Sequence, residues 1–461
     1  MTRHAHLVVD LSNGDAGKGT IVDALVRKYR AHTVIRFNGG AQAAHRVVTG
    51  DGREHIFSQF GSGTFVPGVR TVLSKYVLVQ PWALVPEAEH LEELGITDAF
   101  DRLFIHEDAL IITPFHRAAN RLRERARAKW DGRHGSCGIG VGETAHDALT
   151  LKESLVVRVR DLRDLGALKE KLQRVQKQKA FHVDAMMFQL IDDPEASVDI
   201  IELEDPEAAT SWIKQLEAVL PKLNIIDDTW FASLLNEPGH IVFEGAQGVL
   251  IDESRGFHPY TTWSNCTFQN ALDLLANYDG EIHKIGVVRA YATRHGPGPF
   301  VTEDVHLTER LPDACNKMDP WQRGFRVGHF DCTSTRYAIS ACDGIDSLAI
   351  TCLDRLRDEP AWKICTYYEL APEDEESTLF YVVKTFRGFR LWMDPGPFQD
   401  LIYQERLTHA LERAKPVLHI TTTSGTFDER VEHHVREITQ ELNVPVSILS
   451  FGPTAEDKKF L

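Results

Sequence analysis

Leu7-Val-Val-Asp-Leu-Ser-Asn-Gly-Asp-Ala-Gly-Lys-Gly-Thr20 is the segment that decides how the rest of the chain is interpreted. Its apolar run 7–11 predicts a buried strand, and the apolar-periodic run 21–29 that follows predicts a helix. The residues of interest in the loop between them are Gly14, Asp15, Gly17, Lys18 and Gly19. A strand, a glycine loop and a helix aim backbone N–H groups and a helix N-terminus at a phosphate. The segment therefore predicts a phosphate site.

The loop departs from the ordinary Walker pattern in two places. That pattern needs a glycine five residues before its Gly-Lys pair and a Ser or Thr directly after the pair. Here Ser12 holds the first place and Gly19 follows Lys18. Lys18 still supplies positive charge, and Asp15 can serve as a metal ligand or a base. We therefore expect a phosphate site that is not an ordinary P-loop.

The composition is that of an ordinary globular protein. Hydrophobic residues make up 43% and charged residues 26% of the 461 positions, which are ordinary values. The formal charge of −16 argues against an electrostatic grip on nucleic acid or on an anionic membrane. The sequence has no apolar window long enough for a transmembrane helix, and no signal peptide is predicted. Seven cysteines without a C-x-x-C pair suit reduced thiols, so we expect a soluble cytoplasmic protein.

Strands and helices are predicted to alternate along the chain. A second strand at 32–37 completes a βαβ unit over 7–37, and further strands are expected at 72–79, 284–290, 348–354, 417–421 and 446–450. The segment 241–248 repeats the design of a strand followed by a glycine loop. Helices are expected at 87–94 and 113–130, and the acidic region 161–236 is helix-rich. This alternation predicts the α/β class: a single large domain, 1–461, with a central, mainly parallel twisted sheet flanked by helices.

Asp15 and His45 form a candidate acid/base pair. They are thirty residues apart, yet a βαβ unit places the loops after both of its strands at the same edge of the sheet. A carboxylate and an imidazole beside a phosphate loop suit general acid–base catalysis. The plainer interpretation is that Asp15 forms a turn and His45 is a satisfied core residue. The histidines show no H-E-x-x-H pattern, and no G-x-S-x-G occurs, so neither a zinc protease nor a serine nucleophile is indicated.

Six motifs, in the correct order over nearly the whole chain, resemble those of the adenylosuccinate synthetase family. Two of them are Gly14-Asp-Ala-Gly-Lys-Gly-Thr20 and the intact Phe243-Glu-Gly-Ala-Gln-Gly248. The other four are Gly39-Gly-Ala-Gln-Ala-Ala-His45, Gly135-Ser-Cys-Gly-Ile-Gly-Val-Gly142, His258-Pro-Tyr-Thr-Thr-Trp-Ser-Asn265 and Ala290-Tyr-Ala-Thr-Arg-His-Gly-Pro-Gly-Pro-Phe300. The resemblance implies the adenylosuccinate synthetase fold and its ligase chemistry.

The implied reaction joins L-aspartate to C6 of a 6-oxopurine nucleotide, in first place IMP. GTP phosphorylates O6 while a base removes the N1 proton, and the amino group of aspartate then displaces phosphate. Asp15 matches the base and an Mg²⁺ ligand, His45 the acid that stabilises the phosphoryl group, and Lys18 a phosphate contact. The other matched metal ligand is the carbonyl of Ala44.

The resemblance also assigns the substrate contacts. The residues matched to GTP are Gly14, Gly17, Lys18, Gly19, Thr20, Asp354, Ser450, Gly452 and Pro453. Those matched to the purine nucleotide are Asp15, Asn38, Gln42, Ser136, Lys152, Gln247, Thr262 and Arg323. Lys152 takes the place of an arginine donated across a homodimer interface. Arg323 and Arg326 are matched to the amino-acid substrate.

Several departures from the family pattern leave the substrate open. The family's Glu, His and Asn become Ala16, Ala41 and Gln42, and a lysine that packs on guanine becomes Cys352. The aspartate loop reads Pro320-Trp-Gln-Arg-Gly-Phe-Arg-Val-Gly328 and has lost two arginines and three threonines. Other details resemble the phage branch, which makes 2-aminoadenylosuccinate from dGMP but typically lacks the catalytic aspartate. The alternatives are therefore the same chemistry on (d)GMP, or a catalytically weak paralogue that binds nucleotide as a regulator.

Overall fold

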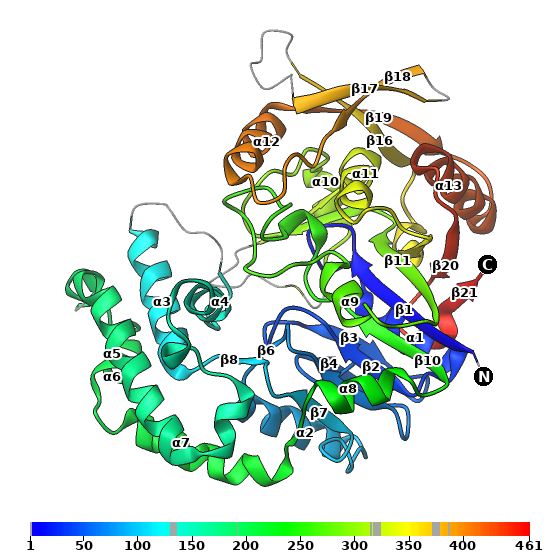
Figure 1. Ribbon diagram of the computed structural model, residues 1–461. Helices are drawn as coiled ribbons and strands as arrows, with labels where there is room; N and C mark the ends of the chain where they lie inside the picture. The colour runs from blue at the N-terminus through cyan, green and yellow to red at the C-terminus, as the bar shows by residue number, and fades with distance from the viewer. Residues whose placement is uncertain are drawn as a thin grey trace.

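A ten-stranded sheet runs through the centre of the computed structural model, which describes residues 2–129, 136–190, 192–313, 316, 324–370, 379–385 and 388–461 (Figure 1). In spatial order its strands are β21 (Lys458–Phe460), β20 (Val446–Ser450), β15 (Ser347–Thr351), β11 (Glu281–Arg289), β1 (Arg3–Asp10), β10 (Gly239–Glu244), β2 (Thr33–Arg36), β5 (Arg70–Leu73), β7 (Leu103–His106) and β9 (Asn224–Ile226). Neighbouring strands pair in parallel except β20 and β21. The predicted α/β class with a mainly parallel sheet is confirmed.

Strand β1 lies in the middle of this sheet and is buried on both faces. Leu7 and Val9 point into a core shared with helices α8 (Asp228–Leu235), α9 (Gln269–Leu274) and α11 (Cys332–Ala341). Val8 points to the other face, against α1 (Lys18–Tyr29). This alternation is the period of two that a strand imposes, and burial on both faces is typical of parallel sheets.

The predicted βαβ unit forms, but its two strands are not neighbours. Strand β10 comes from the segment 241–248, which repeats the design of a strand followed by a glycine loop. It lies between β1 and β2 and pairs with both. Since all three strands are parallel, the loops that follow them still meet at one edge of the sheet. The loops after β1, β2 and β10 contain three of the six motifs.

Smaller sheets extend the molecule on either side. Figure 1 shows two of them above the main sheet, which contain the strands labelled β16 to β19, together with the helices labelled α12 and α13. The pairings are β3 (His45–Val48) with β4 (Glu54–Phe57), β6 (Leu78–Val79) with β8 (Leu110–Ile111), β12 (Ala292–His295) with β13 (Phe325–Gly328), β17 (Phe380–Thr385) with β18 (Gly388–Met393), and the order β14 (Phe330–Asp331), β16 (Trp362–Glu369), β19 (Lys415–Thr422). The remaining α-helices outside the helix-rich region are α2 (Leu84–Glu93), α3 (Pro114–Ala128), α4 (Val141–Thr150), α10 (Val305–Arg310), α12 (Leu401–Arg413) and α13 (Phe427–Leu442).

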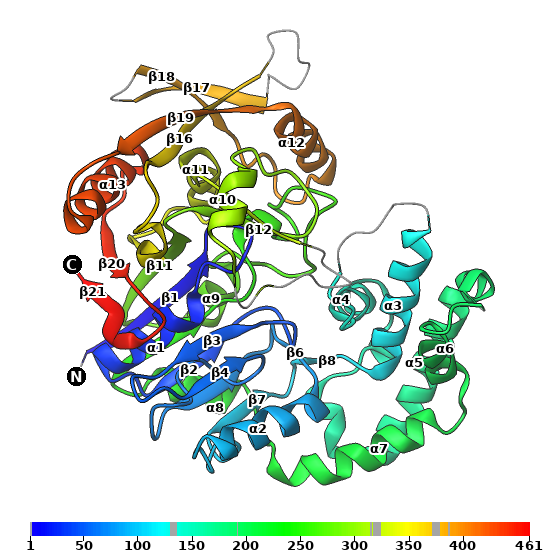
Figure 2. The same cartoon turned by 180° about the vertical axis from the view of Figure 1, so that it is seen from behind.

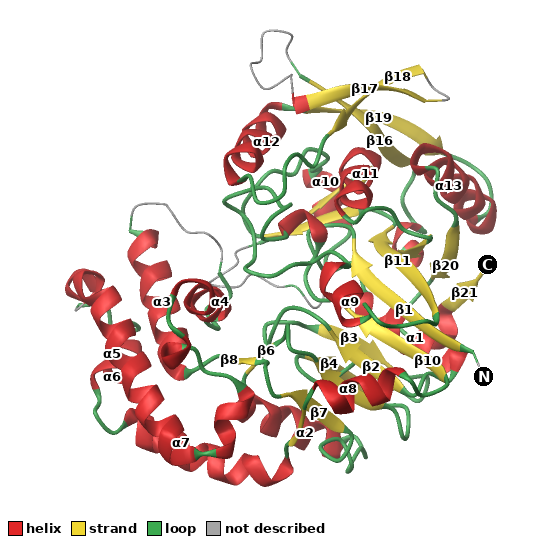
Figure 3. Ribbon diagram, in the orientation of Figure 1, coloured by secondary structure: helices red, strands yellow, loops and turns green. Residues whose placement is uncertain are grey.

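The helix-rich region forms an arc beside the far edge of the sheet, clearest in the red helices of Figure 3. It contains α5 (Leu165–Leu190), α6 (Ser197–Glu204), α7 (Ala208–Val219) and α8. It also contains the strand β9, which the sequence analysis did not predict and which pairs with β7. Apolar side chains of α3, α5 and α7 share one core with strands β5 and β7. The arc is therefore packed onto the sheet.

Several predicted boundaries shift by a few residues. Helix α1 begins at Lys18, three residues earlier than predicted, directly after Gly17 in the left-handed conformation (φ 88°). Strand β15 ends at Thr351, so Asp354 lies in the 3₁₀ turn η6 (Leu353–Leu356) that follows. The strand predicted at 417–421 is β19, which lies in the smaller sheet and pairs antiparallel to β16. The other 3₁₀ turns are η1 (Pro81–Ala83), η2 (Glu153–Leu155), η3 (Val159–Arg163), η4 (Leu220–Lys222), η5 (Val249–Ile251) and η8 (Ala455–Asp457).

The two chain ends lie on the same side of the molecule, beside β1 and β21 (Figure 2). Among the helices of the described residues, none combines the length and the apolar composition needed to cross a bilayer.

Candidate active site

The first glycine loop is organised by Asp10, the last residue of β1. Its Oδ1 accepts hydrogen bonds from the backbone N–H of Ser12 (2.8 Å) and from the Ser12 hydroxyl (2.5 Å). Its Oδ2 accepts from the N–H of Ala16 (2.8 Å) and from Lys18 Nζ (3.0 Å). Both charged side chains are buried. A fully bonded buried ion pair fixes position, so Asp10 holds Lys18 in place and shapes the loop.

The loop after β10 presses against the first loop. A Cβ atom on Gly248 would lie 2.2 Å from the Ser12 carbonyl oxygen, so only glycine allows this approach. Lys18 Nζ also donates to the Gln247 carbonyl, at 2.7 Å. The two glycine loops predicted separately from the sequence are therefore one structure joined by Lys18.

Asp15 lies at the tip of the first loop with a left-handed backbone (φ 60°). Its carbonyl oxygen accepts a hydrogen bond from Arg289 Nε (2.6 Å), and Arg289 also pairs with Asp313 at 3.0 Å. Burial raises the pKa of the Asp15 carboxyl, while the charges of Arg289 and Lys18 oppose that rise. A carboxyl group with a raised pKa is better matched to taking up a proton near neutral pH than an ordinary aspartate.

His45, at the start of β3, pairs with Glu244, at the end of β10. The His45 Nδ1 atom lies 2.5 Å from Glu244 Oε1, and both side chains are buried. Ser62 donates to Glu244 through its N–H (3.0 Å) and its hydroxyl. Burial lowers the pKa of His45 to about 4 in spite of the carboxylate. Although burial opposes it, the charges of Arg36 and His45 lower the pKa of Glu244 to about 2. A ligand would therefore meet the other ring nitrogen of His45, Nε2.

The two predicted acid/base residues lie beside the start of helix α1. A Cβ on Gly19 would lie 2.8 Å from the Cβ of His45, so the histidine packs directly against the first turn of the helix. Asp15 precedes that turn. Asp15 and His45 therefore lie on either side of the N-terminus of α1, and their action as one acid/base pair stays a prediction.

Gln42 and Gln247 form a second group of predicted residues. Within the described structure, the oxygen and nitrogen of both side-chain amides are buried without a hydrogen-bond partner. A Cβ on Gly39 would lie 3.1 Å from Gln247 Oε1, and one on Gly40 would lie 3.0 Å from Gln42 Oε1. A buried amide without a partner costs roughly 1–3 kcal/mol, which a bound polar ligand would recover. These two amides mark a ligand site beside the loop 39–40.

Asn38 and Thr262 lie near this group but serve the framework. The Asn38 amide donates to the Ala246 carbonyl (3.0 Å) and accepts from the Ala246 N–H (2.7 Å), which ties the loop after β2 to the loop after β10. The N–H of Thr262 donates to the Ile251 carbonyl at 2.8 Å. The structure thus shows them as positioning residues, and their predicted contacts to nucleotide stay predictions.

Ser136 and Lys152 flank helix α4. The Ser136 hydroxyl donates to Asn120 Oδ1 (3.0 Å) and accepts from the N–H of Gly138 (3.2 Å). Lys152 is exposed at the other end of the helix, before η2. Helix α4 contacts the loop 259–265 through Trp263, because a Cβ on Gly142 would lie 2.7 Å from Trp263 Cδ1. This contact brings the motif that ends at Gly142 next to the motif 258–265. Lys152, by contrast, is exposed on the surface.

Four of the residues predicted to bind GTP lie together where α1 meets the C-terminal loop, namely Thr20, Ser450, Gly452 and Pro453. The Thr20 hydroxyl donates to the Pro453 carbonyl at 2.7 Å, and the Ser450 hydroxyl to the Gly452 carbonyl at 3.2 Å. Lys458, which the sequence analysis did not single out, donates to the carbonyls of Gly452 (2.7 Å) and Thr454 (2.6 Å). Its charge also acts on Asp354, whose pKa is raised by burial. This C-terminal loop therefore lies beside both α1 and Asp354.

The predicted amino-acid region contains two arginines on paired strands. Arg294 of β12 lies opposite Arg326 of β13. Arg326 donates to Glu303 (2.8 Å) and to the carbonyls of Gly296 (2.8 Å) and Gly298 (2.9 Å). The guanidinium of Arg294 is buried; this burial and the charge of Arg326 lower its pKa to about 9. Arg323, the other predicted contact, lies outside the described residues.

Asn13 connects this region to the first loop. Its side chain accepts from Arg294 Nη1 (2.9 Å) and donates to the Thr293 carbonyl (3.2 Å). A cavity opens beside this connection, and its walls include Asn13, Arg289, Thr293, Phe300 and Asp331. Arg289 lines this cavity and Arg294 lies behind Asn13, so two cationic side chains are placed to suit an anionic ligand.

The donor set at the loop tip fits a magnesium ion. Mg²⁺ takes oxygen ligands and is usually held by one or two protein groups, with water and substrate phosphates completing its shell. The Asp15 carboxylate and the Ala44 carbonyl are oxygen donors of this kind. Ala44 is exposed and precedes His45, which packs against the first turn of α1, just after Asp15 in the chain. The residues present therefore fit the ion.

Comparisons with known proteins point to one family. The family model for adenylosuccinate synthetase matches residues 7–458. The adenylosuccinate synthetase of Myxococcus xanthus is 29% identical over 453 residues, covering 97% of this chain and 96% of the relative. That of Chlorobium limicola is 30% identical over 471 residues, covering 99% of this chain and 97% of the relative.

Two solved structures resemble the fold. The fully ligated adenylosuccinate synthetase of Plasmodium falciparum has a TM-score of 0.76 at 21% identity and 99% coverage of both chains. The succinoaminodeoxyadenylate synthetase of cyanophage S-2L, bound to dGMP and to dATP as energy donor, has a TM-score of 0.56 at 14% identity, covering 100% of this chain and 96% of that one. At these identities, the likeness concerns the fold alone.

Proposed function

Because this chain belongs to the adenylosuccinate synthetase family of C–N bond-forming ligases, we propose that it joins L-aspartate to C6 of a 6-oxopurine nucleotide at the expense of GTP, with IMP as the first-choice substrate. The observation that carries the proposal is that two buried side-chain pairs, each containing a carboxylate, lie at one edge of the sheet. Asp10 holds Lys18 in the phosphate loop, and Glu244 holds His45 beside the same helix start.

We assign each step of the chemistry to a named group. Lys18 and the N–H groups at the start of α1 hold the β- and γ-phosphates of the donor. The Asp15 carboxylate removes the N1 proton of the purine, so that O6 becomes nucleophilic toward the γ-phosphoryl group. His45 acts on that group as an imidazolium: its Nδ1 proton faces Glu244, and the negative charge of the bound phosphates favours a second proton on Nε2, which then donates to the phosphoryl group as its charge develops. The amino group of aspartate then attacks C6 and expels phosphate.

Positioned charge supplies most of this catalysis. An amide-like oxygen is a poor leaving group, and its phosphorylation makes it a good one. Phosphoryl transfer depends mainly on orientation and on electrostatic stabilisation of the transferred group. A magnesium ion held by Asp15 and Ala44 would neutralise charge on the phosphates. Asp10, Glu244 and Ser62 contribute by fixing the groups that act, since all three bind a catalytic side chain or its partner.

We assign both nucleotide substrates to binding sites along this same edge of the sheet. Gln42 and Gln247 offer amide groups to the purine nucleotide, with Ser136, Thr262, Asn38 and Arg323 as further contacts. Asp354 accepts from guanine N1 and N2 of the donor, with Thr20, Ser450, Gly452 and Pro453 around it. The carboxylates of aspartate are assigned to Arg326 and Arg323. We further propose a cytoplasmic homodimer in which the exposed Lys152 reaches the nucleotide of the partner subunit.

A second candidate substrate is (d)GMP. The fold is shared with the phage synthetase, whose structure holds dGMP, and the phage-like sequence details point in the same direction. Retention of Asp15 favours the IMP reaction over this candidate, because the phage branch typically lacks that residue.

One assay separates these candidates. The purified chain is incubated with Mg²⁺, GTP and aspartate together with IMP, dGMP or GMP, and products are identified by mass spectrometry. The proposal expects a succinyl adduct with IMP and one phosphate released per adduct. An adduct formed only with dGMP or GMP would replace IMP by the second candidate. No adduct with any of the three would contradict a ligase and favour a nucleotide-binding regulator.

A further inference from the structure

Four histidines gather at the amino ends of three neighbouring strands, at the opposite edge of the sheet from the active site. In the register of the sheet, His4 of β1 lies opposite His240 of β10 and Glu281 of β11, and His6 lies opposite His283. Residues two apart on a strand point to the same face. All five side chains therefore share one face, which follows from their positions in the sequence and the pairing of the strands.

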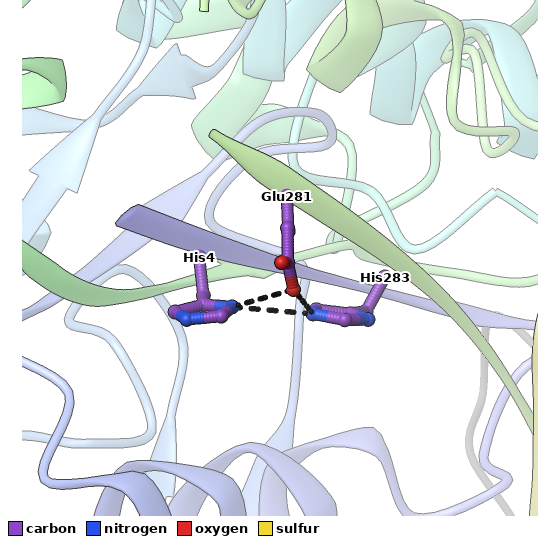
Figure 4. A group of neighbouring side chains, drawn as sticks. All are labelled: His4, Glu281 and His283. Carbon is purple, nitrogen blue, oxygen red and sulfur yellow. Dashed lines mark hydrogen bonds and ion pairs between the residues drawn. The ribbon is translucent and has the colours of Figure 1, made fainter. Parts of the chain in front are cut away.

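Three of these side chains direct donor atoms at a common point, as Figure 4 shows for His4, Glu281 and His283. Glu281 Oε2 lies 3.2 Å from His4 Nδ1 and 3.7 Å from His283 Nε2, and the two ring nitrogens are 3.5 Å apart. In a tetrahedral zinc site with ligands at about 2.0–2.2 Å, neighbouring donor atoms lie roughly 3.3–3.6 Å apart. The three atoms already have nearly this spacing.

The other two histidines form a wall behind these ligands. The ring of His4 stacks on His240 with centroids 4.5 Å apart and planes inclined by 9°. His6 and His240 are linked through ring nitrogens at 3.0 Å. Stacked neighbours fix the orientation of a ligand ring.

The site is open on its outer side. His4 is 19% exposed, whereas His283 and Glu281 are 40% and 65% exposed. The nearest cation on β1, Arg3, is paired with Asn236 and Asp279 and lies on the other face of the strand. A metal ion could therefore enter from solvent and complete its shell with water.

We propose that His4, Glu281 and His283 bind a divalent transition-metal ion of the zinc class. Two imidazoles and one carboxylate are borderline ligands that favour Zn²⁺, Co²⁺ or Ni²⁺ over Mg²⁺. The ion lies far from the phosphate loop, since Asp10 is six positions beyond His4 along β1 and a strand rises about 3.3 Å per residue. It clips together β1 and β11, whose opposite ends carry Asp10 and Arg289. It is therefore a structural support for the active site, not its magnesium.

Zinc binding to the whole chain tests the proposal. Chelator-stripped protein is titrated with ZnCl₂ against a competing zinc indicator, without nucleotide and with a phosphine reductant present. One tight ion per chain is expected. His4→Gln and His283→Gln should each weaken it at least about tenfold, the loss that even an outer-shell partner causes, and the double variant should abolish it. His306→Gln is the matched control, because His306 is exposed and faces Glu309 three residues on.

Thermal unfolding of the same proteins gives a second readout. Zn²⁺ should raise the Tm of the parent and of His306→Gln, but not that of the double variant, and the same concentration of Mg²⁺ should leave all three unchanged. A double variant that binds zinc as tightly as the parent would overturn the site. So would zinc that GTP and Mg²⁺ displace, because it would then occupy the active site.

Discussion

Two regions of this molecule are built differently: the phosphoryl-transfer end, around Lys18 and His45, and the amino-acid end, around Arg294 and Arg326. At the first, Lys18 and His45 each have a buried carboxylate partner, Asp10 for Lys18 and Glu244 for His45. At the second, Arg294 and Arg326 lie opposite each other and bind mainly backbone carbonyls, with Glu303 as the carboxylate on Arg326. The contrast indicates that the chemistry is fixed in advance, whereas the amino-acid end retains positive charge for a ligand.

The largest expected effect is at the acid/base pair. Asp15→Asn and His45→Asn should each lower turnover by roughly 10²- to 10⁴-fold, the usual contribution of a positioned acid or base. Nucleotide binding should persist, because the folds of both loops are held by other residues. Phosphate release and equilibrium nucleotide binding are measured side by side, with His306→Asn as the control. Parent-like turnover in both variants would remove Asp15 and His45 from the mechanism.

The second prediction concerns stability at the same end. Asp10→Ala leaves Lys18 buried without its partner, which should cost about 3–5 kcal/mol in the free energy of unfolding. Adding Lys18→Met should recover part of that loss, and denaturant unfolding measures both. Arg326→Met, at the other end, should cost much less because its guanidinium is nearer to solvent. Equal losses at the two ends would contradict the contrast.

The third prediction weakens the chemistry through a positioning residue. Glu244→Gln removes the carboxylate from His45 and should lower kcat by roughly 10- to 100-fold, since hydrogen bonds to charged groups contribute about 1.5–3 kcal/mol. KM for either nucleotide should change little. Ser62→Ala, which removes one donor to Glu244, is the graded comparison. A change confined to KM would place Glu244 in binding instead.

At the amino-acid end, the expected effect falls on binding. Arg326→Met should raise KM for the amino-acid substrate about tenfold, the loss of one charge-assisted contact, with kcat and nucleotide binding nearly unchanged. Initial rates at varied aspartate measure this. A fall in kcat with an unchanged KM would show that the two ends are not separable.

The smallest effect is expected where α1 meets the C-terminal loop. Thr20→Ala removes the hydrogen bond to the Pro453 carbonyl and should raise KM for GTP about fivefold, corresponding to about 1 kcal/mol. Thr20→Ser keeps the hydroxyl and should behave like the parent. If both variants behave alike, the hydroxyl has no part in holding this loop against α1.

Much of this architecture follows from the sequence, and the remainder depends on long-range contacts. The parallel sheet and the position of Asp15 and His45 on either side of the start of α1 follow from strand and helix periodicity and from the geometry of parallel connections. The insertion of β10 between β1 and β2 does not, because local patterns do not specify strand order. Strand β9 was missed for a related reason, since a three-residue edge strand leaves almost no signal within a helical region.

The same limit applies to the site. Glu244 stands in a motif that was identified, yet its bond to His45 joins residues 199 positions apart. Asp10 and Arg289 were missed because a charged residue at a strand end has many possible roles until its partners are known. A buried carboxylate before a glycine loop was the available signal for Asp10.

The central claim is that the purine O6 is phosphorylated before the amino acid attacks. It is tested most directly with a 6-oxopurine nucleotide carrying ¹⁸O at position 6, incubated with GTP, Mg²⁺ and aspartate. The mechanism predicts that each phosphate released carries the ¹⁸O atom, because the oxygen leaves C6 as part of the phosphate. Adduct formation with unlabelled phosphate, and the ¹⁸O found in water, would contradict it.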